Sequence, residues 1–199
     1  MNTAPTGQSL PFLGKLVRVF CWRVRVDSAG EVIAIDSSRR FIDTARLLQS
    51  NGSITYDARL EGDVSESHVA RKPTDACSDR IQFEVGDALD LRPDLGDFDL
   101  VLAANLLDRV PDPSRLLGGF GRLVRQGGQL VLTSPYTWLE EYTPRHAWLP
   151  RDGHRTSERL AGLLPGFTLA RRQDLPFVLR EHARKFQWSV AEATTWRRI

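Results

Sequence analysis

Four positions in this 199-residue chain carry groups suited to binding a nucleoside. Asp36 ends an apolar run, and a carboxylate there can accept hydrogen bonds from both hydroxyls of a ribose. Asp87 can accept from the exocyclic amine of an adenine while the backbone N–H of Ala88 donates to the ring. Asn105 ends a second apolar run and joins this set by position. For Asp87 a turn or a helix cap is the alternative interpretation.

Three apolar runs would position these groups, at residues 31–36, 98–105 and 128–133. Unbroken apolar runs are typical of parallel strands covered on both faces by helices. Segments with helical spacing separate the runs, and alternating strands and helices predict a parallel α/β sheet. Ligands of such sheets bind beyond the carboxyl ends of the strands. We therefore expect 98–105 to be the central strand and the site to lie at this edge.

The loop that follows the third run, 134–145, leaves the same edge. It combines three aromatic residues with two carboxylates and an arginine, namely Tyr136, Trp138, Tyr142, Glu140, Glu141 and Arg145. Aromatic walls with a few polar groups are typical of small-molecule pockets. Equally, these aromatic side chains can simply cover the edge of the sheet.

The remaining pattern predicts helices and strands around this sheet. Ser37 or Ser38 caps a helix over 39–49 that Gly52 ends, and 80–85 alternates as a strand. For 53–79 we expect at most a short strand near 54–56 and then a flexible loop. Residues 16–26 alternate valine with arginine and read as a partly exposed strand.

The second half of the chain contains two further helices. Asp112 and Pro113 cap a helix that glycines end at 127–128. Its Gly118–Gly121 cluster lies inside the helical pattern, so we interpret the glycines as serving close helix packing. Thr156 or Ser157 caps another helix. Residues 167–171 and 177–180 follow as two strands or one interrupted strand, and 186–196 is a further strand that is antiparallel if 181–185 makes the turn.

Length and composition restrict the class of protein. The chain fits one domain, its formal net charge is +2, and it has two cysteines. We expect residues 1–30 to be an atypical, partly disordered segment and 31–199 to form the domain. Scattered arginines do not favour nucleic acid, His and Cys spacing does not predict a metal site, and no run is long enough for a membrane span. We therefore expect a cytoplasmic protein.

Several stretches together resemble the methyltransferase of ovothiol biosynthesis, a class I S-adenosylmethionine-dependent family with a Rossmann-like sheet. The resemblance rests on 92–96, 98–113, 123–145 and 175–198, with 180–188 at the core of the last stretch. That family methylates a ring nitrogen of 4-mercaptohistidine, often as the C-terminal domain of a sulfoxide synthase. It implies S-adenosylmethionine as cofactor, a small amino acid as substrate, and association with such a synthase.

The resemblance also assigns roles to residues. Asp36 would hold the ribose, Asp87 and Ala88 the adenine, and Asn105 the wall near the methionine part. If a catalytic base exists, it would be Glu141 or His182, although ionisation of the neighbouring thiol already activates the ring. The residues implied in substrate binding are Tyr136, Trp138, Tyr142, Arg145, Arg180 and Lys185.

The chain departs from that family at its beginning. A first strand should lead through a glycine-rich turn into a helix, because backbone N–H groups there hold the cofactor. Residues 16–29 contain no glycine, and 21–31 is too short for a parallel crossover. We therefore expect the first strand–helix unit to be degenerate or missing, and cofactor binding to be weak or absent. The alternative to an enzyme is a non-catalytic binding module; a nicotinamide-dependent oxidoreductase ranks third, because no strand leads into the required glycine fingerprint.

Overall fold

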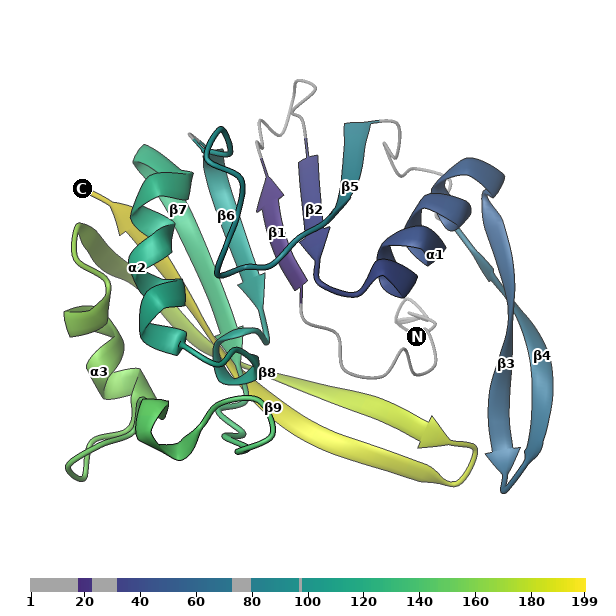
Figure 1. Ribbon diagram of the computed structural model, residues 1–199. Helices are drawn as coiled ribbons and strands as arrows, with labels where there is room; N and C mark the ends of the chain where they lie inside the picture. Colours follow the sequence, from purple (N-terminus) through teal and green to yellow (C-terminus); the bar gives the residue numbers. More distant parts are fainter. Residues whose placement is uncertain (1–17, 23–31, 73–79, 97) are drawn as a thin grey trace, which may run out of the picture.

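A seven-stranded mixed sheet forms the centre of the computed structural model, which describes residues 18–22, 32–72, 80–96 and 98–199 (Figure 1). The strand order is β5-β2-β1-β6-β7-β9-β8. The strands are β1 (Arg18–Trp22), β2 (Val32–Asp36), β5 (Ile81–Val85), β6 (Phe98–Ala104), β7 (Val124–Ser134), β8 (Phe167–His182) and β9 (Lys185–Arg198). β2 pairs parallel with β5 and β6 with β7, whereas β9 is antiparallel to both neighbours. The predicted α/β class, with parallel pairs at the core and an antiparallel C-terminal strand, is confirmed. The sheet is less parallel than predicted, because β1 pairs antiparallel with β2 and β6.

The first strand is present but runs in the opposite direction. β1 lies between β2 and β6 and is antiparallel to both. Residues 23–31 separate it from β2, and so short a segment suits an antiparallel connection better than a parallel crossover. The degenerate first unit that the sequence predicted therefore takes the form of a reversed strand. The helix expected to be missing, at 21–31, falls largely on residues outside the described part of the chain.

Helices lie on both faces of the sheet. α2 (Pro113–Leu123) and α3 (Thr156–Leu163) pack on the face that carries Val101 and Leu130. α1 (Arg39–Asn51) contacts β2, β3 and β5, and its buried Ile42 lies outside that core. Three caps follow the sequence: Ser38 caps α1, Gly52 ends it at a positive φ of 72°, and Asp112 caps α2. The predicted end of α2 at 127–128 is wrong, because α2 ends at Leu123 and both glycines lie inside β7.

The central position predicted for 98–105 is confirmed, since β6 is fourth of seven strands. Its burial alternates, however: Val101 and Ala103 are buried, whereas Leu100 and Leu102 are half-buried. Among the described helices α2 packs against β6, and α1 lies farther along the sheet. An apolar run alone therefore did not reveal that the two faces differ.

Figure 1 shows two hairpins, of which β3–β4 forms a separate two-stranded sheet and β8–β9 belongs to the seven-stranded sheet. β3 (Ser53–Glu61) pairs with β4 (Val64–Arg71), so the short strand and loop expected over 53–79 are wrong for 53–71, while 73–79 lies outside the described residues. Cross-strand pairing, which local pattern does not show, stabilises this polar hairpin. β8 covers both segments predicted at 167–171 and 177–180 as one strand, with a bulge after Leu169. Its pairing with β9 confirms the antiparallel strand predicted at 186–196.

The β8–β9 hairpin continues past the carboxyl edge. Ser134, the last residue of β7, pairs with Glu192, so 185–191 lies beyond that edge. β8 contacts β3, and Figure 1 shows the two hairpins meeting. Trp188 is 67% exposed near the end of the hairpin. Among the helices that the structure describes, none is long and apolar enough to cross a membrane.

Candidate active site

Asp36 and Asp87 are neighbours at the carboxyl edge of the sheet. β2 ends at Asp36, and β5 ends one strand away at Val85. The N–H of Gly86 donates a 3.1 Å hydrogen bond to the carbonyl of Asp36. A Cβ on Gly86 would lie 2.9 Å from Cγ2 of Ile35, so glycine permits this close approach. The structure thus brings together the two carboxylates that the sequence assigned to one nucleoside.

The Asp36 side chain is held by its own turn. It is 7% exposed, and its Oδ1 accepts a 2.8 Å hydrogen bond from the N–H of Ser38. The Ser38 hydroxyl in turn accepts from the N–H of Phe41 and caps α1. Asp36 therefore stands at a fixed position between the strand and the helix that follows it.

Asp87 is exposed, and one of its oxygens closes a turn. Its Oδ1 accepts a 2.9 Å hydrogen bond from the N–H of Leu89, as the alternative interpretation of this residue predicted. The side chain of Ala88 is half-buried. A turn of this kind leaves a carboxylate with further lone pairs, because each oxygen accepts more than one hydrogen bond.

Asn105 adopts a backbone conformation that few non-glycine residues take, with φ at 51°. Its N–H donates to the carbonyl of Thr133 at 2.8 Å, and the Thr133 hydroxyl donates to Oδ1 of Asn105 at 2.9 Å. β1 separates it from Asp36, which corresponds to about 10 Å for two strand spacings. Strained residues held by such pairing concentrate at functional sites.

A buried acid behind this edge was not singled out from the sequence. Asp108, in the short 3₁₀ segment η2 (Leu107–Arg109), is 0% exposed. Its Oδ1 accepts from the Ser134 hydroxyl at 3.0 Å, and Nη1 of Arg109 lies 2.9 Å from its Oδ2. Burial raises the pKa of the Asp108 carboxyl, and Arg109 lowers it only in part. The sequence signal that could have identified this pair is an acid and an arginine within the otherwise apolar stretch 106–110.

Arg109 connects this pair to the loop after β7. Its Nη1 donates to the carbonyl of Thr137 at 2.7 Å, and its guanidinium lies 5.0 Å from the ring centre of Tyr142. The loop 135–142 is therefore held by the half-buried Arg109, which pairs with the buried Asp108.

Tyr136 is anchored at a second point. Its hydroxyl donates a 2.6 Å hydrogen bond to Glu192 of β9, and Nε of Arg172 lies 3.5 Å from the other oxygen of Glu192. Burial, followed by the hydrogen bond to Glu192, raises the pKa of the Tyr136 phenol. Its φ is 53°, so this residue also carries backbone strain. The phenol therefore stays protonated and acts as a donor.

The other aromatic residues of the loop are partly structural. The Trp138 side chain packs against the main core and donates to the Thr156 hydroxyl at 3.2 Å. Thr156 begins α3 instead of capping it; the N-cap is Arg155. Arg145 lies 5.3 Å from the Trp148 ring centre and 3.4 Å from Glu140. Trp138 thus fits the interpretation that the loop covers the protein interior, and Glu141 is exposed. The interpretation of the loop as a pocket wall stays a prediction.

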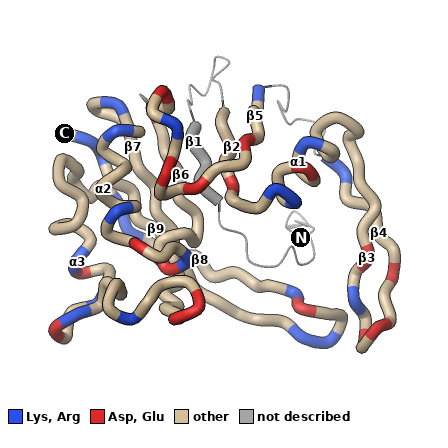
Figure 2. Tube along the Cα trace, viewed as in Figure 1, with Lys and Arg blue, Asp and Glu red and all other residues tan. Residues whose placement is uncertain are grey.

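The remaining predicted residues lie at the end of the β8–β9 hairpin. Arg180 and His182 are half-buried, and Nδ1 of His182 accepts a 3.3 Å hydrogen bond from the N–H of Arg184. Nζ of Lys185 lies 2.6 Å from Glu181. Figure 2 shows both signs of charge along this end of the hairpin. These residues lie on a different element from the residues predicted to bind the cofactor, which are Asp36, Asp87, Ala88 and Asn105.

Comparison with known proteins decides the family. A family model described as a methyltransferase domain matches residues 16–167. The chain belongs to the methyltransferase domain family. No curated protein sequence is similar enough to the chain to count as a match.

Solved structures show the same fold for this methyltransferase domain. One of them is described under the conversion of a disulfide bond into a thioacetal group during echinomycin biosynthesis. Its TM-score is 0.52 at 17% identity, and the match covers 83% of this chain and 65% of that chain. The methyltransferase domain thus spans about two thirds of that protein's length. An S-adenosylmethionine-dependent methyltransferase of Methanosarcina mazei has a TM-score of 0.50 at 19% identity, covering 83% and 80%.

A third structure limits what the fold implies. The [4+2]-cyclase SpnF has a TM-score of 0.51 at 17% identity, with 86% of this chain and 68% of that chain covered. Because one fold hosts different reactions, the substrate must be argued from the site. Within the described ranges, no group of three His, Cys, Asp or Glu residues is placed to hold a metal ion.

Proposed function

We propose that this methyltransferase domain is an S-adenosylmethionine-dependent N-methyltransferase of the imidazole ring of 4-mercaptohistidine. The assignment of S-adenosylmethionine as cofactor is supported by one observation. Asp36 and Asp87 are neighbours at the carboxyl edge, where the N–H of Gly86 bonds to the carbonyl of Asp36. The substrate rests on the sequence resemblance of 98–113, 123–145 and 175–198 to the ovothiol family. Association with a sulfoxide synthase is part of the same proposal.

The described residues fit the adenosine half of the cofactor. Asp36 would accept from the ribose hydroxyls, and Asp87 with the N–H of Ala88 would hold the adenine. Asn105 would form the wall near the methionine part. At the place where the family has a glycine-rich turn, the edge instead receives the amino end of the reversed β1. We therefore expect weak cofactor binding.

When bound, S-adenosylmethionine supplies an electrophilic methyl group on its sulfonium. This chain would contribute binding and orientation, which can supply several kcal/mol of the barrier for a two-reactant step. Tyr136, Trp138, Tyr142 and Arg145 would form the substrate side, and Arg180 or Lys185 would pair with the substrate carboxylate. Glu141 or His182 would take the ring proton if a base is required.

The reversed β1 favours a second candidate, a non-catalytic binding module with the methyltransferase fold. In a parallel first strand the connecting loop would reach the carboxyl edge, whereas the carboxyl end of β1 at Trp22 lies at the opposite edge. Loss of that loop removes backbone donors from the cofactor site.

Two measurements separate the candidates. Calorimetric titration with S-adenosylhomocysteine to millimolar concentration should give saturable heat, and radiolabelled S-adenosylmethionine should label 4-mercaptohistidine but not histidine. Absence of both signals rejects the enzyme and favours the binding module. Equal labelling of histidine leaves a methyltransferase but rejects the mercaptohistidine proposal.

A further inference from the structure

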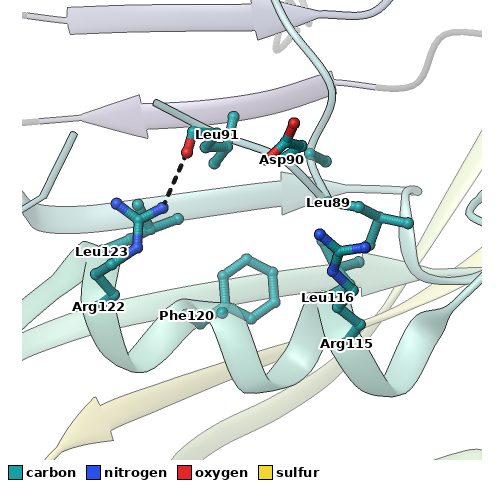
Figure 3. A pocket seen from close by; sticks show the side chains of 10 residues that line it. Leu89, Asp90, Leu91, Arg115, Leu116, Phe120, Arg122 and Leu123 are labelled. Carbon is teal, nitrogen blue, oxygen red and sulfur yellow. Dashed lines mark hydrogen bonds between the residues drawn. The ribbon is translucent and has the colours of Figure 1, made fainter. Parts of the chain in front are cut away.

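A cavity of about 350 Å³ lies between α2 and the chain segment that follows β5 (Figure 3). Small-molecule pockets usually measure roughly 300–1,000 Å³ and are lined mainly by apolar groups with a few polar ones. Asp36, Asn105 and the loop 134–142 do not line it. The lining residues are Ala88, Leu89, Asp90, Leu91, Arg115, Leu116, Gly119, Phe120, Arg122 and Leu123.

The glycine cluster of α2 has no packing role, so the close helix packing predicted from the sequence is wrong. A Cβ on Gly118, Gly119 or Gly121 would meet no atom within 4 Å. Each glycine inside a helix costs about 1 kcal/mol relative to alanine. Of these three glycines Gly119 lines the cavity. Its missing side chain keeps the cavity open.

The walls of the cavity are fixed before any ligand arrives. The Arg122 guanidinium donates to the carbonyls of Leu91 at 3.4 Å and Leu95 at 2.9 Å, which ties the segment after β5 to α2. Phe120 is 1% exposed and Leu116 is 3% exposed, so both are held by the core. Preformed walls reduce the ordering cost of binding.

Arg115 supplies the polar end. Figure 3 shows Phe120 between Arg115 and Arg122 along α2, facing the segment Leu89 to Leu91. Within the described residues the Arg115 guanidinium donates no hydrogen bond and forms no ion pair, whereas Arg122 is engaged with carbonyl groups. Two arginines and one acid, Asp90, leave the lining with excess positive charge.

We propose that this cavity, which Asp36, Asp87 and Asn105 do not line, is a second binding site for a small aromatic carboxylate. The planar body would lie against the half-buried Ala88, Leu89 and Leu91. The carboxylate would pair with Arg115, whose planar fork suits two parallel hydrogen bonds. The site shares Ala88 with the proposed adenine contacts but does not depend on methyl transfer.

Indole-3-carboxylate tests the proposal by calorimetric titration of the full chain. Gly119→Leu should weaken binding at least tenfold, because the new side chain occupies the cavity. Gly118→Leu is the matched control: it changes the neighbouring exposed glycine of α2, does not line the cavity, and should bind as the unchanged chain does. Arg115→Gln should weaken the binding of indole-3-carboxylate tenfold but leave the binding of neutral indole unchanged. The thermal midpoints of all variants should confirm that they fold.

Three outcomes overturn the proposal. The first is no saturable heat with millimolar indole-3-carboxylate. The second is equal binding by the Gly119→Leu and Gly118→Leu variants, which would place the probe elsewhere, for example on the exposed Phe186 and Trp188 of the β8–β9 hairpin. The third is that Arg115→Gln weakens the binding of indole and of indole-3-carboxylate equally.

Discussion

The Ser134 hydroxyl donates a 3.0 Å hydrogen bond to Oδ1 of Asp108, and both side chains are buried. Asp108 lies between β6 and α2, whereas Ser134 ends β7 and begins the loop of the proposed substrate side. Arg109 neutralises the acid and donates to Thr137 in the same loop. The position of the loop is thus coupled to one buried carboxylate.

Replacing Asp108 by alanine should lower the free energy of unfolding by about 3 kcal/mol, because Arg109 and Ser134 then lose a buried partner. Urea unfolding measures this. Glu140→Ala provides the matched control, since Glu140 and Arg145 form an ion pair with side chains 64% and 76% exposed. Exposed pairs contribute about 0–1 kcal/mol. Equal losses in the two variants would contradict the structural role of Asp108.

Asp108 should also give a characteristic pH dependence. Burial raises its pKa above the ordinary value of 3.8, so between the unfolded and folded pKa values the folded protein binds this proton more tightly. Its contribution to the free energy of unfolding therefore falls as pH rises through that window. The side chain introduced by Asp108→Asn cannot ionise, so this variant should gain stability relative to the unchanged chain as pH rises above the ordinary aspartate pKa of about 3.9. Urea unfolding across this range tests it; a relative loss on raising pH would reverse the sign of the assigned shift.

Asp36→Asn should weaken S-adenosylhomocysteine binding by about tenfold to a hundredfold, since a hydrogen bond to a charged group contributes about 1.5–3 kcal/mol. The asparagine oxygen can still accept from the N–H of Ser38, so the fold should persist. Asp43→Asn is the control, because Asp43 is exposed on α1. Calorimetry measures both. Equal affinities in the two variants would remove Asp36 from the proposed ribose site.

Two tryptophans of β9 should respond differently to replacement by alanine. Trp196 is 1% exposed in the main core, and Trp196→Ala should cost about 3–5 kcal/mol of unfolding free energy. Trp188 is 67% exposed, and Trp188→Ala should change stability by about 0.5 kcal/mol or less. Thermal or urea unfolding followed by circular dichroism distinguishes them. A large loss in Trp188→Ala would mean that the hairpin end is covered in solution.

The local sequence pattern was sufficient to predict those features that interactions between neighbouring residues determine. Ser38, Gly52 and Asp112 bound their helices as expected, because caps satisfy backbone groups of adjacent residues. The strand at β6 followed from its apolar run, and its place among parallel neighbours from the alternation of strands and helices. The sequence also placed Asp36 and Asp87 at one edge of the sheet, and the structure joins them through Gly86.

Sequence alone therefore determined the α/β class, most of the strands and helices, and the carboxylates of the candidate nucleoside site. Only tertiary structure decided the direction of β1, the β3–β4 hairpin, the role of Gly119 and the Asp108–Ser134 contact. These depend on pairing and packing between residues far apart in the chain, and hydrophobic period carries no information about which distant partner a strand or side chain meets.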